Sequence, residues 1–147
     1  MNISIREGNS QDFEAVFFLI KEFSIFQKTP EKVLTSPEQM LADQHLFQCF
    51  VAQTDANEII GFASYFFAYY SWSGKALYLD DLYVKAAFRG SKTGTALLEA
   101  VMHLAKKENC KRIRWLVAGW NDTAITFYEK MGAKIDRTDI ICELELI

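Results

Sequence analysis

Residues 76–105 read ALYLDDLYVKAAFRGSKTGTALLEAVMHLA, and this stretch decides the fold. Its first part is aliphatic and aromatic except for Asp80 and Asp81, which is typical of a buried strand. Its last part carries apolar residues at helical spacing from Ala96 to Leu104. Small, polar and basic residues lie between the two parts. Because a helix that follows such a loop begins with unpaired backbone N–H groups, the stretch predicts an anion-binding cradle.

The composition restricts the class of protein. The chain has 147 residues, enough for one domain with a sizeable core, which we expect to cover residues 1–147. Half of the residues are hydrophobic and 24% are charged, so the chain is expected to be globular and soluble. The net charge of −3 argues against a nucleic-acid partner. The longest apolar run, residues 59–70, is too short to span a bilayer, and no membrane association is expected.

Cysteine usage gives a prediction about the compartment. Cys49, Cys110 and Cys142 match no metal-ligand spacing, and only two histidines accompany them. We therefore expect no metal site and no covalent acyl-enzyme. Sparse cysteines are typical of a reducing compartment, and the N-terminus carries no apolar signal region. The expected location is the cytoplasm.

Periodicity and turn residues predict an α/β chain with a mixed sheet. Helix caps are expected at Asn9 or Ser10, at Ser36, and at Asn121 or Asp122. The expected helices lie within residues 10–27, 37–44, 96–105 and 121–131. The expected strands cover residues 2–6, 47–53, 58–70, 77–84, 111–118, 133–135 and 140–147, the last because apolar residues alternate with Glu143 and Glu145.

The order of these elements predicts how they assemble. Residues 47–53 and 58–70 should form a hairpin, and residues 77–118 one parallel strand–helix–strand crossover. A mixed β-sheet with helices on both faces follows. Ligands of such sheets bind beyond the carboxyl ends of the strands, which is where the cradle lies.

The loop alone identifies no ligand. It is not a P-loop, because Ser91 separates Gly90 from Lys92, and it has no GxGxxG pattern. Taken by itself, Arg-Gly-x-x-x-Gly is more often a solvated loop than a binding site.

Two motifs together are more specific. Residues 89–98, RGSKTGTALL, resemble the acetyl-CoA pyrophosphate loop of the GNAT superfamily of N-acetyltransferases. The second signature of that superfamily is similar to Trp120-Asn121, Ala124, Phe127-Tyr128 and Gly132-Ala133. Residues 60–133 further resemble the diamine (spermidine/spermine) and thialysine acetyltransferase branch. The resemblance implies a GNAT-like fold, acetyl-CoA as the acyl donor and a homodimer.

The resemblance also implies which residues bind coenzyme A. Backbone groups left unpaired where the central strand splays from its neighbour would bond the pantetheine amides, and the Val84 N–H would polarise the thioester carbonyl. The implied contacts are Leu82, Tyr83, Val84, Arg89, Gly90, Ser91, Lys92, Thr93, Gly94, Thr95, Asn121 and Ala124. Asn121 can also be a plain helix cap, and Arg89 a solvated cation.

Three positions depart from the pattern of the family. Lys92 stands where the loop usually has glycine, which would cost roughly 1 kcal/mol if φ is positive there. Its ammonium group would offset this by meeting a phosphate. Gln27 and Tyr70 stand where the polyamine branch carries acids, which weakens a site for a long polycation.

Two catalytic residues are predicted. Helical spacing alone makes Tyr128 a core aromatic, whereas the resemblance implies a general acid that protonates the leaving thiolate. Asp80 and Asp81 are consecutive on a strand, so they are expected to face opposite sides. We expect Asp80 to attract the substrate ammonium and to accept its proton. Asp81 is either structural or helps to hold the amine.

Phe26 and Gln27 match substrate-lining positions of the branch, and Trp72 can stack on the aliphatic stem or the cation of the substrate. Trp72 can equally be a hydrophobic plug in the turn before the central strand. The sequence thus predicts an acetyl-CoA-dependent N-acetyltransferase that acts on a primary amine of a small molecule, a diamine, polyamine or lysine-like amine. The alternatives are a protein or peptide amine as the acceptor, and a non-catalytic acyl-CoA-binding module.

Overall fold

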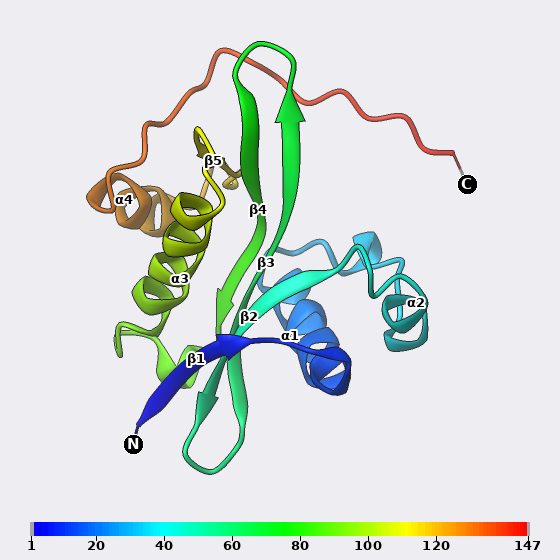
Figure 1. The fold of residues 1–147 in the computed structure, drawn as a ribbon. Helices are drawn as coiled ribbons and strands as arrows, with labels where there is room; N and C mark the ends of the chain where they lie inside the picture. The colour runs from blue at the N-terminus through cyan, green and yellow to red at the C-terminus, as the bar shows by residue number, and fades with distance from the viewer. Residues whose placement is uncertain (1, 147) are drawn as a thin grey trace. The chain divides into compact units, whose positions relative to one another are not determined.

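The computed structural model describes residues 2–146, which divide into two compact units. The first unit extends to Trp115 and the second begins at Leu116. The first unit contains a five-stranded sheet in the order β1-β2-β3-β4-β5 (Figure 1). The strands are β1 (Ile3–Glu7), β2 (Gln48–Thr54), β3 (Ile59–Tyr70), β4 (Gly74–Val84) and β5 (Ile113–Arg114).

The sheet is mixed, as the sequence predicts. The pairs β1–β2, β2–β3 and β3–β4 are antiparallel, whereas β4 and β5 are parallel. The predicted β2–β3 hairpin and the predicted parallel crossover are therefore confirmed. The β3–β4 hairpin is long and extends beyond the rest of the sheet (Figure 1).

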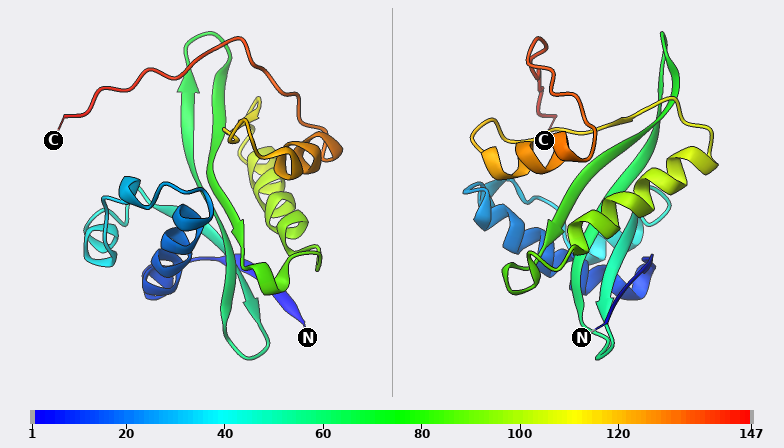
Figure 2. Two further views of the ribbon diagram at one scale, coloured as in Figure 1. Left: turned by 180° about the vertical axis from the view of Figure 1, so that it is seen from behind. Right: turned by 90° about the vertical axis from the view of Figure 1, so that its left-hand side faces the viewer.

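Helices cover both faces of the sheet in the first unit. Helices α1 (Phe13–Phe26) and α2 (Pro37–Ala42) lie on one face and α3 (Thr93–Lys107) on the other, as Figures 1 and 2 show. Three short 3₁₀ helices accompany them, η1 (Ser10–Asp12), η2 (Pro30–Lys32) and η3 (Ala86–Phe88). Asn9 and Ser36 cap η1 and α2 with their side chains, within the caps predicted from the sequence.

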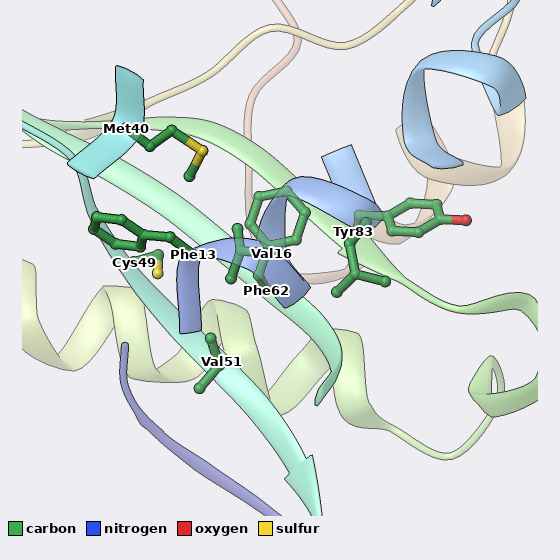
Figure 3. Close-up of a cluster of buried hydrophobic side chains, with 8 residues drawn as sticks. Phe13, Val16, Met40, Cys49, Val51, Phe62 and Tyr83 are labelled. Carbon is green, nitrogen blue, oxygen red and sulfur yellow. The ribbon is translucent and has the colours of Figure 1, made fainter. Parts of the chain in front are cut away.

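The core beneath α1 fixes one face of the sheet. Buried side chains of α1 pack against alternate residues of the strands, which share a face because of the two-residue period of a strand (Figure 3). The cluster consists of Phe13, Val16, Leu19, Met40, Cys49, Val51, Phe62 and Tyr83. On the opposite face, α3 buries Leu97, Leu98, Val101 and Ala105.

The second unit contains α4 (Asp122–Lys130). Asn121 caps this helix, since its Oδ1 accepts a hydrogen bond from the Ala124 N–H at 3.2 Å. Gly132 follows the helix at φ +97°, as a C-terminal glycine should.

Two strand predictions are wrong. Residues 133–135 and 140–146 form no strand. The predicted 111–118 strand is shortened to β5, although Lys111 and Arg112 also form backbone hydrogen bonds with β4. Alternating polarity shows that a segment is compatible with a half-buried strand, but a strand also needs a neighbour for its hydrogen bonds. Residues 140–146 are exposed throughout, so none of the residues that the structure describes covers them as a neighbouring strand. Residue 147, the last of the predicted strand, lies outside the described residues.

No helix within residues 2–146 has the length and the apolar character needed to cross a bilayer.

Candidate active site

A β-bulge places the two consecutive acids. Asp81 pairs with Ser64 and Leu79 pairs with Tyr65, so Asp80 is an extra residue without a partner on β3. A bulge breaks the alternation of side chains. Both acids consequently line one cavity, and the expectation that they face opposite sides is wrong. The Asp81 N–H donates to the Ser64 Oγ at 3.2 Å, which holds the backbone of the bulge in place.

The cavity has a volume of about 610 Å³, which is within the range of small-molecule sites. Strand β4 supplies the two acids, and α1, α2 and the segment between these helices supply most of the remaining lining. Phe23, Met40 and Phe47 give it apolar walls, whereas Lys32 and Asp43 are the other charged residues that line it. The arrangement suits a ligand with an aliphatic body and charged ends.

Burial changes the proton affinity of the acid pair. Desolvation, together with the nearby charge of Asp80, raises the pKa of Asp81 to about 7. Partial burial also raises the pKa of Asp80, which is the more exposed of the two. A carboxylate that titrates near neutral pH can take a proton from a bound ammonium and release it again.

The structure separates the three predicted substrate-lining residues. Gln27 lines the cavity at the end of α1. Phe26 does not line the cavity. The centroid of its ring lies 4.8 Å from the guanidinium carbon of Arg89. Trp72 is fully exposed in the turn between β3 and β4, and the structure does not bring it to the cavity. The substrate contacts of these residues stay predictions.

The other edge of β4 is largely unpaired. β5 pairs only with Leu77 and Tyr78, so no strand lies beside the last six residues of β4 within the part of the chain that the structure describes. The Lys85 N–H donates to the Ile60 carbonyl at 2.9 Å on the β3 side. Because hydrogen-bonding direction alternates along an antiparallel strand, Leu82 and Val84 direct their N–H and C=O groups to the unpaired edge, and Tyr83 directs its own toward β3. The unpaired backbone groups implied by the resemblance are therefore present on β4, and their contacts with coenzyme A stay predictions.

The loop after β4 leads into the N-terminus of α3. Gly90 has φ +83° and Lys92 has φ +65°, so the strained conformation expected for Lys92 is present. The Ser91 hydroxyl donates to the Phe88 carbonyl and lies 2.7 Å from the Thr93 hydroxyl, which closes the turn. A Cβ built at Gly90 meets no atom within 4 Å, so there is room above the backbone for a ligand.

Arg89 is held by more than one contact. Its Nε donates to the Val84 carbonyl at 3.0 Å, and its guanidinium lies over the rings of Phe26 and Tyr83. Unpaired N–H groups at the first turn of α3 and two cations beside them fit a diphosphate. The side of β4 that holds unpaired amide groups fits an amide-containing chain such as pantetheine.

The remaining predicted residues belong to the second unit. Asn121 and Ala124 form the cap of α4, and Tyr128 is buried on the same helix with its ring centroid 5.5 Å from that of Phe127. The core position that helical spacing gives Tyr128 is confirmed. Its role as a general acid, and the coenzyme contacts of Asn121 and Ala124, stay predictions.

Sequence reasoning missed Lys32, Asp43 and Ser64, which all line the cavity. Ser64 reads as one more residue of an apolar strand, and Lys32 and Asp43 lie in segments without a motif. One signal was available for the bulge, because two successive acids inside a buried strand are costly unless the strand is irregular there.

Comparison with known proteins agrees with this geometry. A family model described as the Acetyltransferase (GNAT) family matches residues 12–133. Thialysine N-epsilon-acetyltransferase from Mus musculus is 30% identical over 141 residues, which cover 88% of this chain and 83% of the mouse protein. Spermidine/spermine N(1)-acetyltransferase-like protein 1 from Homo sapiens is 31% identical over 139 residues, which cover 88% of this chain but 20% of that protein.

Solved structures show the same fold. An aminoglycoside N-acetyltransferase in complex with CoA superposes with a TM-score of 0.78 at 18% identity, and the match covers 97% of this chain and 95% of the other.

Proposed function

The chain belongs to the acetyltransferase (GNAT) family, and on that premise we propose that it transfers the acetyl group of acetyl-CoA to a primary amine of a small molecule. One observation carries the proposal: a cavity of about 610 Å³ that is lined by two acids brought together by a bulge. The acids and apolar walls of the cavity suit a small amine, and a protein or peptide amine is the alternative acceptor. A diamine or a lysine-like amine fits, and the names of the relatives point to the same compounds.

The acid pair binds the amine and removes its proton. An alkylammonium with a pKa near 10.4 is neutral in only about one molecule in 10³ at pH 7, so deprotonation must be assisted. The sequence assigns this task to Asp80. The pKa of about 7 makes Asp81 equally suited to it, because a general base works best when its pKa is near the ambient pH.

The unpaired edge of β4 and the loop bind the acyl donor. Leu82 and Val84 offer backbone groups to the pantetheine chain, while Arg89, Lys92 and the amides of residues 90–95 hold the diphosphate. Acetyl-CoA, when bound, supplies a thioester whose carbonyl carbon is open to attack. The Val84 N–H donates to the carbonyl oxygen of that thioester and stabilises the negative charge that develops there.

Proton transfers complete the reaction. Asp80 or Asp81 first takes one proton from the ammonium, directly or through water, which leaves a neutral amine with a lone pair that can attack. As the C–N bond forms and the C–S bond breaks, the nitrogen loses a second proton to water. Tyr128 gives its phenolic proton to the departing sulfur. A thiolate with a pKa of about 8.5 needs little help, so we expect Tyr128→Phe to lower kcat by about tenfold to a hundredfold.

The direct test measures thiol release from acetyl-CoA with a panel of small amines. Turnover with at least one amine, reduced in Tyr128→Phe and unchanged in the exposed control Tyr69→Phe, supports the proposal. Stabilisation of the protein by CoA without turnover on any amine would instead identify a non-catalytic binding module. An unchanged kcat in Tyr128→Phe would remove the general acid from the mechanism.

Three expectations from the sequence complete the proposal. We expect one functional domain, a cytoplasmic location and a homodimer. Exposed apolar side chains support a contact between copies, among them Trp72 in the β3–β4 hairpin and Ile140, Leu144 and Leu146 near the C-terminus. Light scattering coupled to gel filtration measures the oligomeric state.

A further inference from the structure

The bulge brings a third polar side chain to the acid pair. Ser64 lies on β3 opposite Asp81, and residues opposite one another in an antiparallel pair share a face of the sheet, with Cβ atoms about 5 Å apart. The side chain of Ser64 lines the same cavity as both acids, although only 3% of the residue is exposed. A buried hydroxyl on an apolar strand is costly, so its hydrogen bonds indicate what offsets that cost.

The hydroxyl of Ser64 keeps most of its hydrogen-bonding capacity. Its Oγ accepts one hydrogen bond, from the Asp81 N–H at 3.2 Å, and within residues 2–146 it donates none. A hydroxyl has one donor and two acceptor positions, so one of each remains. Ser24, the other serine of the lining, differs because its Oγ already donates to the Lys21 carbonyl at 2.6 Å. Of these two serines, Ser64 can therefore accept a hydrogen bond from a ligand and donate one at the same time.

The reacting ammonium group needs three acceptors. A primary ammonium has three N–H groups, and an N–H without a partner is costly beside apolar walls. Asp80 and Asp81 supply two acceptors, and Ser64 on the neighbouring strand supplies an uncharged third. The other charged residues of the lining, Lys32 and Asp43, come from η2 and from the end of α2. The two acids and the hydroxyl are thus the polar groups that the sheet itself offers to the amine.

We infer that Ser64 is a further catalytic residue of this site, whose Oγ accepts a hydrogen bond from the substrate ammonium and whose O–H donates one to the Asp81 carboxylate. The inference rests on the proposed function and adds a route through the protein for the first proton. In this route an N–H bond of the ammonium breaks as an O–H bond forms on Ser64, while the original hydroxyl proton passes to the carboxylate. The amine becomes neutral, Asp81 becomes protonated, and Ser64 is again a neutral hydroxyl.

The hydrogen bond from Ser64 to the Asp81 carboxylate forms when the amine is bound. A hydrogen bond donated to a carboxylate stabilises its ionised form, so the hydroxyl lowers the pKa of Asp81 in the complex with the amine. The pH dependence of kcat reports this complex, whereas that of kcat/KM for the amine reports the enzyme before the amine binds. Loss of the hydroxyl should therefore shift the pH profile of kcat to higher pH and leave that of kcat/KM in place.

Two substitutions at Ser64 test this role. Ser64→Ala removes the hydroxyl, and Ser64→Thr keeps it in a residue that suits a strand. The probe amines are 1,4-diaminobutane and lysine, together with any amine of the panel that the wild type accepts, because the inference concerns only the reacting ammonium group. At saturating acetyl-CoA we expect Ser64→Ala to lower kcat/KM about tenfold and to raise the pH midpoint of kcat by about one unit, as expected for a lost hydrogen bond to a charged group. Ser64→Thr should stay within about threefold of wild type in kcat/KM and keep its pH midpoint.

The matched control is Thr54→Val. Thr54 lies in β2 and is also 3% exposed, and its Oγ1 accepts a hydrogen bond from the Glu58 N–H at 3.2 Å, but it does not line the cavity. This variant therefore loses a comparable buried hydroxyl and a comparable backbone hydrogen bond in the same sheet. We expect its kcat/KM and its pH profiles to be those of wild type.

The outcomes separate the inference from the proposed function. Equal losses in Ser64→Ala and Thr54→Val, or in Ser64→Ala and Ser64→Thr, would mean that Ser64 only holds the bulge. A wild-type pH midpoint of kcat in Ser64→Ala would remove the hydrogen bond to Asp81. Each of these results overturns the inference while turnover by the wild type still supports the proposed function. Absence of wild-type turnover with every amine would overturn the proposed function, and the inference with it.

Discussion

The two edges of β4 differ in how completely they are paired. Toward β3 the strand is paired along nearly its whole length, interrupted only by the bulge at Asp80. Toward β5 it is paired at Leu77 and Tyr78 and then left open. One edge is thus a continuous ladder with a single irregular residue, and the other a short ladder followed by unpaired backbone.

The difference assigns a separate task to each edge. The paired edge fixes the backbone of β4, so a local irregularity there aims two carboxylates at one cavity. The unpaired edge presents backbone donors and acceptors that a ligand with amide groups can satisfy. Because pairing with β3 holds β4 in position, the hydrogen-bonding groups on the β5 edge of β4 can remain partly unpaired.

The largest effect is expected where the bulge places its acids. Asp80→Asn and Asp81→Asn should each lower kcat/KM for the amine by roughly 10²- to 10³-fold, because general-base catalysis and binding of the ammonium are lost together. The KM for acetyl-CoA should change little. Asp55→Asn, which removes an exposed carboxylate from the turn between β2 and β3, is the control. Wild-type activity in both cavity variants would show that the bulge is structural only.

The pKa of Asp81 gives a second effect, on stability. The pKa is about 7 in the folded protein and about 3.9 in an unfolded chain, so the folded state binds the proton more tightly. Folding stability from this group is therefore highest below about pH 4, falls as pH rises to about 7, and is constant above. Allowing for solvent screening, we expect Asp81→Asn to be more stable than wild type by about 2 kcal/mol at pH 8.

Urea unfolding at pH 5 and pH 8 measures this difference. The difference in the free energy of unfolding between Asp81→Asn and wild type should be larger at pH 8 than at pH 5. The free energy of unfolding of Asp55→Asn should follow that of wild type at both pH values. In the activity assay, kcat/KM for the amine should rise with pH through about 7 and lose this dependence in Asp81→Asn. If the difference in the free energy of unfolding became smaller with rising pH, the raised pKa of Asp81 would be contradicted.

Arg89 tests the unpaired edge. Arg89→Gln removes a cation from the loop, the hydrogen bond to the Val84 carbonyl and the contacts with the Phe26 and Tyr83 rings. We expect the KM for acetyl-CoA to rise about five- to tenfold, and the KM for the amine to stay within about twofold. Lys106→Gln removes a cation at the opposite end of α3 and should leave both values unchanged. If Arg89→Gln changed the KM for the amine more than the KM for acetyl-CoA, the two edges of β4 would not have separate tasks.

The smallest effect concerns two residues of the loop with positive φ. Lys92→Gly relieves a left-handed conformation and should raise the free energy of unfolding by up to about 1 kcal/mol, partly offset by the greater freedom of glycine in the unfolded chain. Gly90→Ala introduces the same strain and should lower the free energy of unfolding by about 1 kcal/mol, since no neighbour contacts the new methyl group. Thermal melts compare the two.

The two variants also test the diphosphate site. Lys92→Gly should weaken acetyl-CoA binding although it stabilises the protein, because the cation is lost. Tighter binding of acetyl-CoA in this variant would mean that Lys92 obstructs the site.

Local signals made most of the sheet and its helices predictable. The caps at Asn9, Ser36 and Asn121 are short-range hydrogen bonds that depend on residue type and a fixed spacing. The strand–loop–helix order of residues 76–105 likewise fixed the crossover, and the resemblance of the loop and of residues 120–133 indicated the family.

What the sequence did not reveal depends on partners far away in the chain. The bulge at Asp80 exists because β3 and β4 change register between Ser64 and Tyr65, and neither strand shows this alone. Residues 140–146 have the alternation of a strand but no neighbour in this structure. Lys32 and Asp43 came together in the lining of one cavity through the packing of η2 and α2, which no local pattern encodes.

The bulge has a consequence at the level of the gene. Loss of the single codon for residue 80 would leave Ser64 opposite Asp81 and Tyr65 opposite Leu79 in an uninterrupted ladder. One negative charge would disappear from the cavity, and every other lining side chain would keep its identity. Amine preference in this fold can thus be tuned by an in-frame change of strand length as well as by replacement of residues.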